Sequence, residues 1–186
     1  ARARRLFERV LSRFDYRLVD VTAPPVGLPR VCESLKARGF SPNTVIDVGV
    51  GAGTPWLYAA FPRARFELFE PIEAFRPAIE DATAGLDASV HFCALGETNS
   101  SLPIEVDPAH PTSSTMAHYH DDYVRAARGG AQRPATVVQD VPVRPLDDFG
   151  PFKGPTLVKL DVEGYESHVI QGARQTLQAA EVIISE

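Results

Sequence analysis

The stretch that decides the fold is Val45-Ile46-Asp47-Val48-Gly49-Val50-Gly51-Ala52-Gly53-Thr54, which runs from an apolar segment through three glycines into a helix start. Residues 44–48 predict a buried strand, and Thr54 before Pro55 predicts a capped helix N-terminus. Glycine permits positive φ in a tight turn, and its lack of a Cβ lets a ligand lie against backbone N–H groups. The segment therefore predicts a site for a nucleotide-like ligand; the alternative is a merely flexible turn.

The glycine spacing argues against a dinucleotide. Dinucleotide-binding folds use G-x-G-x-x-G, whereas this turn reads G-x-G-x-G, and the third dinucleotide glycine would fall on Thr54. The chain also has no P-loop and no Tyr-x-x-x-Lys proton relay. An NAD(P)-dependent oxidoreductase is therefore the second choice of function.

Strand and helix patterns alternate after residue 43, which is typical of a parallel sheet with crossover helices. We expect an α/β fold with a Rossmann-like, doubly wound, mostly parallel sheet, in which the first and fourth strands are neighbours. The expected main strands are 44–48, 65–69, 89–93, 156–160 and 181–185, and the expected helices are 29–37, 55–61, 73–82 and 165–178. Two extra strands are expected at 102–106 and 137–143, the latter at an edge because it contains Pro142, and another helix from Met116 within 112–128.

Length and composition predict one globular domain. The chain has 186 residues, of which 44% are hydrophobic, and its net charge of 19 − 24 = −5 gives no electrostatic reason to bind nucleic acid. We divide it into a helical extension (1–38) and a ligand-binding domain (39–186). The extension begins with an Arg-rich amphipathic pattern over 2–19, read as a helix packed on the domain or, alternatively, as a contact for a membrane surface or partner.

The sequence constrains the cellular compartment and the oligomeric state less than it constrains the fold. No stretch is long and apolar enough for a transmembrane segment, and the start lacks the apolar core of a signal peptide. The two cysteines, Cys32 and Cys93, are too few for a disulfide framework. We expect a cytoplasmic protein with no disulfides. The sequence leaves open whether the chain forms a homo-oligomer and whether it is a fragment of a longer protein.

Acidic residues follow two of the predicted strands. Glu70 ends the second strand roughly 20 residues after the glycines, where a carboxylate can accept the hydroxyl protons of a ribose; the alternative is an ordinary helix-start acid. Asp161 and Glu163 end the apolar fourth strand, where burying them is costly unless they bind something, although either could cap the next helix. Because the first and fourth strands are neighbours, we expect Asp47 and Asp161 to face one pocket.

Five segments in this order resemble the FkbM-type S-adenosylmethionine-dependent methyltransferases. The resemblance extends from about residue 39 to 186 and is most specific in its last segment. The segments are Val45-Ile46-Asp47-Val48-Gly49, Phe69-Glu70-Pro71, Ala94-Leu95-Gly96, Arg144-Pro145-Leu146-Asp147-Asp148 and Lys159-Leu160-Asp161-Val162-Glu163-Gly164-Tyr165-Glu166.

The resemblance implies a class I methyltransferase fold with S-adenosyl-L-methionine as cofactor. It assigns the methionine moiety to the turn, the ribose to Glu70 with Pro71 beside it, the adenine surroundings to Ala94, and the cofactor amino group or the acceptor to Asp161. The turn residues in that assignment are Asp47, Gly49, Val50, Gly51 and Gly53. Ser113-Ser114 would lie in the substrate-side insertion. Because this fold normally has two strands after the fifth, the sheet is expected to lack its last two strands unless the chain is a fragment.

Transfer of a methyl group to a hydroxyl needs alignment of the reactants and removal of a proton. We expect Asp161 and Glu163 to be the catalytic acids, one as base and the other orienting the hydroxyl or the cofactor amine. The acceptor would be a hydroxyl of a small molecule: a sugar, a glycan or a polyketide-like product. A non-catalytic binding module is the third alternative.

A metal site is not expected. His118 and His120 have a metal-like composition around them, but on a helix they point in different directions, so a solvated face is the preferred interpretation. His168 is read as an exposed helix residue, and Cys93 as a small core residue rather than a nucleophile.

Overall fold

A computed structural model describes residues 27–106 and 137–185. Its main sheet has five parallel strands in the order β3-β2-β1-β7-β8. The strands are β1 (Thr44–Val48), β2 (Arg65–Phe69), β3 (Asp87–His91), β7 (Thr156–Leu160) and β8 (Val182–Ser185). The predicted Rossmann-like, doubly wound sheet is confirmed, including the contact between its first and fourth strands, β1 and β7.

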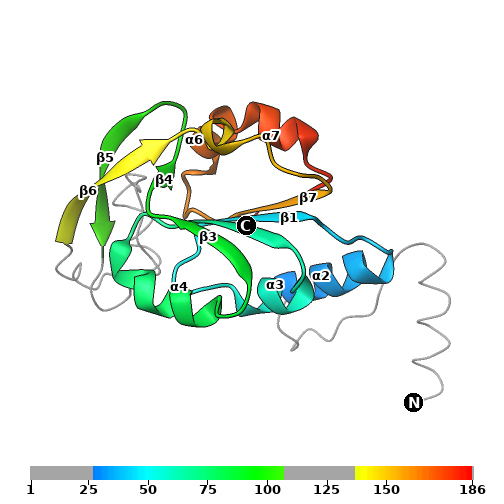
Figure 1. The fold of residues 1–186 in the computed structure, drawn as a ribbon. Coiled ribbons are helices and arrows are strands. Elements are labelled where there is room, and N and C mark those ends of the chain that lie inside the picture. The colour runs from blue at the N-terminus through cyan, green and yellow to red at the C-terminus, as the bar shows by residue number, and fades with distance from the viewer. Residues whose placement is uncertain (1–26, 107–136, 186) are drawn as a thin grey trace, which may run out of the picture.

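Helices cover both faces of this sheet, which explains why the central strands are buried throughout and mostly apolar. Every residue of β1 and of β7 is buried. In Figure 1, α2, α3 and α4 lie below the sheet, and α6 and α7 lie above it. The helices are α2 (Leu28–Ala37), α3 (Pro55–Ala60), α4 (Arg76–Ala82), α6 (Glu166–Gln171) and α7 (Arg174–Ala179), with short 3-10 turns η2 (Glu73–Phe75) and η4 (Leu146–Phe149).

Alternation of side chains along the strands divides the core into two layers. Val45, Phe66 and Leu68 pack with the layer below the sheet, to which α2 contributes the buried Cys32. Ile46 and Val48 pack in the layer above the sheet, to which α6 contributes the buried Val169. The division of the chain at residue 38 stays a prediction.

A second, three-stranded sheet lies beside the main one, in the order β4-β6-β5 (Figure 1). Its strands are β4 (Ala94–Leu95), β5 (Ser100–Val106) and β6 (Val137–Arg144). The prediction that Pro142 marks an edge strand is wrong, because β6 is the middle strand. Proline is tolerated there because β4 pairs only with Val143 and Arg144, so Pro142 lies beyond that ladder.

Several element boundaries also differ from the predictions: β5 begins at Ser100 rather than at 102, and the helix expected over 73–82 is the 3-10 turn η2 followed by α4. The third strand begins and ends two residues earlier, at Asp87 and His91, because its alternating side chains pair in register with β2. The single helix expected over 165–178 is interrupted at Gly172, where an added Cβ would lie 1.9 Å from the carbonyl oxygen of Gly96. This close approach to the segment after β4 divides the helix into α6 and α7.

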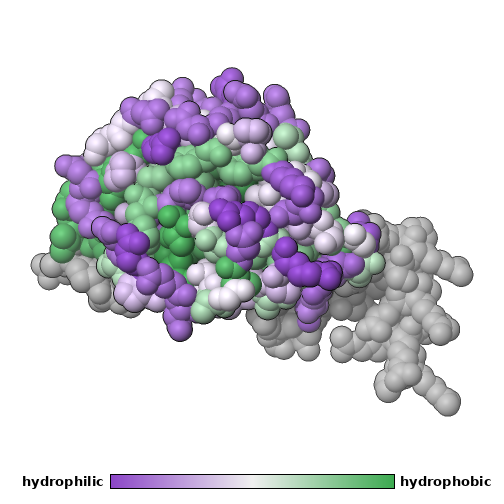
Figure 2. Space-filling view, in the orientation of Figure 1, coloured by the Kyte–Doolittle hydropathy of each residue, from purple (hydrophilic) through white to green (hydrophobic). Residues whose placement is uncertain are grey.

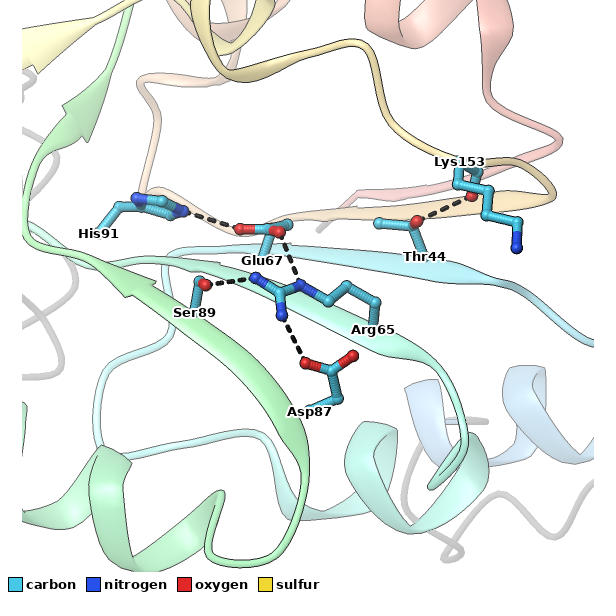
Figure 3. Close-up of polar contacts among 7 residues, drawn as sticks. All are labelled: Thr44, Arg65, Glu67, Asp87, Ser89, His91 and Lys153. Carbon is cyan, nitrogen blue, oxygen red and sulfur yellow. Dashed lines mark hydrogen bonds and ion pairs between the residues drawn. The ribbon is translucent and has the colours of Figure 1, made fainter.

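Polar side chains form a ladder across β2 and β3 (Figure 3). Arg65 contacts Glu67, Asp87 and Ser89, and Glu67 also contacts His91 at 2.8 Å. Much of this ladder is solvent-exposed, since 43% of the Arg65 side chain and 67% of that of Asp87 are accessible.

The surface drawn in Figure 2 is hydrophilic around most of its outline, with apolar residues gathered toward its middle.

Several predictions fall on residues 1–26 and 107–136, which lie outside the described residues. These are the Arg-rich helix over 2–19, the helix from Met116, Ser113-Ser114, and the histidines 118 and 120. None of the helices within the described ranges has the length and apolar character needed to span a bilayer.

Candidate functional site

A cavity of about 340 Å³ opens at the carboxyl ends of β1, β2 and β7. Ligands bind at this edge of open parallel sheets, where the strand order reverses, and roughly 300 to 1,000 Å³ is usual for small-molecule sites. Its walls come from segments far apart in the chain: the glycine turn, residues 69–72, residues 93–95, Lys159 and the acidic turn after β7. The structure therefore brings the glycine turn, Glu70, Ala94 and the acidic turn around one cavity.

The glycine turn is shaped by its backbone. Gly49, Gly51 and Gly53 all have positive φ, of 78°, 56° and 113°. At Gly49 a second constraint operates, because an added Cβ would lie 1.8 Å from the carbonyl oxygen of Asp161. The missing side chain at Gly49 therefore makes room for the end of β7, so close ligand approach is not needed to explain this glycine.

Thr54 stands at the N-cap of α3 as predicted, but its side chain makes no capping hydrogen bond. Its hydroxyl instead interacts with Asp47. The helix thus begins at Pro55, and the hydroxyl of the preceding Thr54 interacts with the buried carboxylate of Asp47.

Glu70 is the most firmly held acid in the cavity wall. It is 4% exposed; its Oε2 accepts a hydrogen bond from Gly51 N at 2.7 Å, and its Oε1 accepts one from Ile72 N at 2.9 Å. Burial raises the pKa of Glu70 above its ordinary value, and these two backbone donors oppose that rise. Each carboxylate oxygen still has lone-pair capacity for a ligand hydroxyl.

Asp47 does not face the cavity, contrary to the prediction. It is fully buried, and its Oδ2 accepts a hydrogen bond from the Tyr58 hydroxyl at 3.2 Å. Its Oδ1 has no aligned hydrogen bond within the described residues and instead lies 3.2 Å from Lys159 Nζ. Burial raises the pKa of Asp47, and Lys159 opposes the rise. Because this carboxylate lies inside the wall, direct contact with a ligand is not supported.

Lys159, to which the sequence analysis gave no role, lines the cavity and is 3% exposed. Its ammonium contacts both Asp47 and Asp161, the latter at 3.4 Å, and donates a hydrogen bond to the carbonyl oxygen of Gly49 at 2.8 Å. The available signal was a lone lysine in an otherwise apolar strand. A buried cation of this kind requires anionic partners.

Asp161 and Glu163 both line the cavity, as expected. Neither is required as a cap for the turn, because Glu166 Oε1 accepts hydrogen bonds from Val162 N and Gly164 N, both at 3.2 Å. Glu163 has a φ of 53°, the one non-glycine residue with positive φ in the described ranges. Such a backbone is uncommon for a residue with a side chain and often occurs at functional sites.

The rest of the wall is mostly apolar. Val50, Pro71 and Ala94 line the cavity, and Cys93 is a buried wall residue with a free thiol. Further wall residues that were not predicted come from separate elements, among them Trp56, Phe75, Ile104 and Tyr165. Tyr165 stacks on the exposed ring of His168, with the ring centroids 4.2 Å apart.

No group of three or more His, Cys, Asp or Glu residues in the described part of the chain is arranged to hold a metal ion. Glu70 instead accepts hydrogen bonds from backbone N–H groups, and Asp161 forms an ion pair with Lys159. This arrangement suits an organic ligand with hydroxyl groups and positive charge.

One comparison with known proteins identifies a relationship. The family model described as the methyltransferase FkbM domain matches residues 47–186. Searches of curated proteins and of solved structures found no significant match. The match begins at Asp47, within β1, and covers every described residue that lines the cavity except Leu28.

Proposed function

Because this chain belongs to the FkbM methyltransferase family, we propose that it uses S-adenosyl-L-methionine to methylate a hydroxyl group of a small molecule. The observation that carries the proposal is the convergence of Glu70, Asp161 and Glu163 on one cavity at the switch point of the sheet. Sugars, glycans and polyketide-like products are the acceptor classes we favour. We place the reaction in the cytoplasm, a setting supported by two free, buried thiols.

The residues present fit this cofactor. Glu70 would hold the ribose hydroxyls, since both of its oxygens are fixed by backbone donors and retain acceptor capacity. The turn from Gly49 to Gly53 would accommodate the methionine moiety, and Pro71 and Ala94 would border the adenosine. The acidic wall complements a cofactor with an ammonium group and a sulfonium.

Bound S-adenosylmethionine supplies an electrophilic methyl group on a sulfonium. The protein has to hold the acceptor oxygen in line with that methyl and remove the hydroxyl proton. We assign proton removal to Glu163, which lies at the exposed end of the acidic turn, and cofactor orientation to Asp161. Both roles stay predictions for these residues.

The cofactor assignment can be tested by calorimetric titration of the full chain with S-adenosylmethionine, S-adenosylhomocysteine and NAD⁺. We expect binding of the first two and none of NAD⁺; the reverse pattern would restore the oxidoreductase alternative. Glu70→Gln should weaken S-adenosylhomocysteine binding about 10- to 100-fold, as expected for lost hydrogen bonds to a charged acceptor. Glu67→Gln on the same strand is the matched control, because Glu67 does not line the cavity.

Transfer itself can be tested with methyl-labelled cofactor and a panel of sugars and polyketide-like alcohols. Glu163→Gln should abolish labelling while leaving S-adenosylhomocysteine binding within about twofold. Unchanged labelling by both Glu163→Gln and Asp161→Asn would remove carboxylate catalysis from the mechanism. Binding without labelling of any acceptor would favour the non-catalytic alternative.

A further inference from the structure

Lys159 joins three parts of the cavity wall through one ammonium group. Its Nζ lies 2.8 Å from the carbonyl oxygen of Gly49, 3.2 Å from Asp47 Oδ1 and 3.4 Å from Asp161 Oδ2. The three acceptors belong to the glycine turn, to β1 and to the end of β7. The contact with Gly49 is a hydrogen bond, whereas the contacts with the two carboxylates are ion pairs.

The surroundings of Lys159 separate it from an ordinary ligand-binding cation. Within the described ranges it is the one cationic side chain that lines the cavity, and Glu70, Asp161 and Glu163 are the acids that do. Only 4% of its side chain is exposed, against 31% for Asp161. The ammonium is therefore directed into the wall, whereas the carboxylate that it contacts remains accessible from the cavity.

Asp161 depends on Lys159 for its orientation. In the described part of the chain, the ion pair through Oδ2 is the one side-chain contact recorded for this carboxylate. Its other oxygen is left available to a ligand. Without Lys159, the side chain would be free to change rotamer and to turn toward solvent.

We propose that Lys159 is a positioning residue that fixes Asp161 as the acceptor for the cofactor's amino group. This inference rests on the proposed function and adds a division of labour between the two acids. Asp161, held by Lys159, binds the cationic amino-acid end of the cofactor. Glu163, on the same turn, is the acid to which the proposed function assigns removal of the acceptor's proton.

A purely structural role for Lys159 makes a different prediction. In that case the ammonium only neutralises the buried Asp47. Buried ion pairs can often be replaced by neutral groups of similar size without loss of stability. Replacing both charges should then leave cofactor binding normal. The double variant Asp47→Asn/Lys159→Met tests this directly, because it removes the buried pair and still leaves Asp161 without its partner.

The experiment compares two probes by calorimetry on the full chain. S-adenosylhomocysteine carries the amino-acid end, and 5′-methylthioadenosine keeps the adenosine and thioether but lacks the amino acid. We expect the double variant to bind S-adenosylhomocysteine about 10- to 100-fold more weakly than the wild type, and 5′-methylthioadenosine within about twofold. Asp161→Asn should show the same selective loss. Lys159→Arg keeps a cation at this position and should therefore bind S-adenosylhomocysteine more tightly than the double variant does.

The outcomes separate the two levels of the proposal. Failure of the wild type to bind S-adenosylhomocysteine would reject the proposed function itself. Wild-type binding combined with normal binding by the double variant would overturn the role of Lys159, as would an equal loss of both probes. If thermal denaturation shows that the double variant does not fold, Asp161→Asn decides, and an equal loss of both probes there would also overturn the proposal.

Discussion

Replacing Gly49 with alanine should damage the protein more than any ordinary positive-φ substitution. The residue has a φ of +78°, and the added Cβ would lie 1.8 Å from the carbonyl oxygen of Asp161 and 2.8 Å from its carbonyl carbon. A comfortable C···O approach is about 3.3 Å, so the two backbones would have to separate by roughly 1.5 Å. Neither atom belongs to a side chain that could rotate away.

The cost can be estimated from two contributions. A left-handed conformation costs a non-glycine residue about 1–2 kcal/mol. Separation of the backbones would also break the hydrogen bond that Asp161 N donates to Val48 O at 3.1 Å, and an unsatisfied buried group costs about 1–3 kcal/mol. The total is about 2–5 kcal/mol of free energy of unfolding, or about 4–20 °C in Tm for a chain of this size.

Gly85→Ala is the matched control. Gly85 has nearly the same φ, +82°, but no atom lies within 4 Å of its added Cβ. Its replacement should therefore cost only the free energy of the left-handed backbone conformation, about 1–2 kcal/mol. Urea unfolding at equal m-values measures both variants, and titration with S-adenosylhomocysteine reports the site. Equal destabilisation by the two substitutions, with cofactor affinity intact in Gly49→Ala, would refute the close approach of the turn to β7.

Three further outcomes are expected. Glu163→Gly should relieve the left-handed backbone at φ 53° and raise the free energy of unfolding by up to about 1 kcal/mol while abolishing methyl transfer; retained transfer would contradict its role as base. At Asp147, burial favours a higher pKa, but hydrogen bonds donated by Gln175 N and Thr176 N outweigh it and lower the pKa. Its stabilisation is thus present above the ordinary pKa of 3.8 and lost as pH falls below it. The deficit of Asp147→Ala, about 1 kcal/mol at pH 7, should therefore shrink in urea titrations at acid pH rather than stay constant. Arg65→Ala should cost less than about 1 kcal/mol, and less still at 1 M salt, because its ion pairs are exposed; a larger, salt-independent loss would show that the polar ladder is structural.

The fold could be predicted from sequence because the limits of its central strands follow from the residues of those strands themselves. β1 and β7 begin and end where their buried, mostly apolar runs do, and parallel strands buried on both faces leave that simple pattern. The outer elements were less predictable. β3 has alternating polar residues whose limits depend on pairing with β2, and the interruption at Gly172 depends on Gly96, a residue distant in sequence.

The site was predictable only where a residue's role follows from its place on one strand. Glu70 directly follows β2 and lies in the cavity wall, as the sequence indicates. Asp47 was expected in the pocket because β1 and β7 are neighbours, yet alternation along β1 turns its side chain into the layer below the sheet. Trp56, Phe75 and Ile104 come from three separate elements, and nothing in their local sequence shows that they meet.

Lys159 shows how register links the fold to the site. In the pairing of β1 with β7, Asp47 lies directly opposite Lys159, so the single acid and the single base of two otherwise apolar strands share one face. A slip of one residue would turn Lys159 to the opposite face, among the apolar side chains above the sheet, and leave both charges buried without partners. The pair therefore favours one register, and that register also places Asp161 beside the turn at Gly49. We conclude that the same buried contact that aligns the two strands also sets the distance between the glycine turn and the acid that faces the cavity.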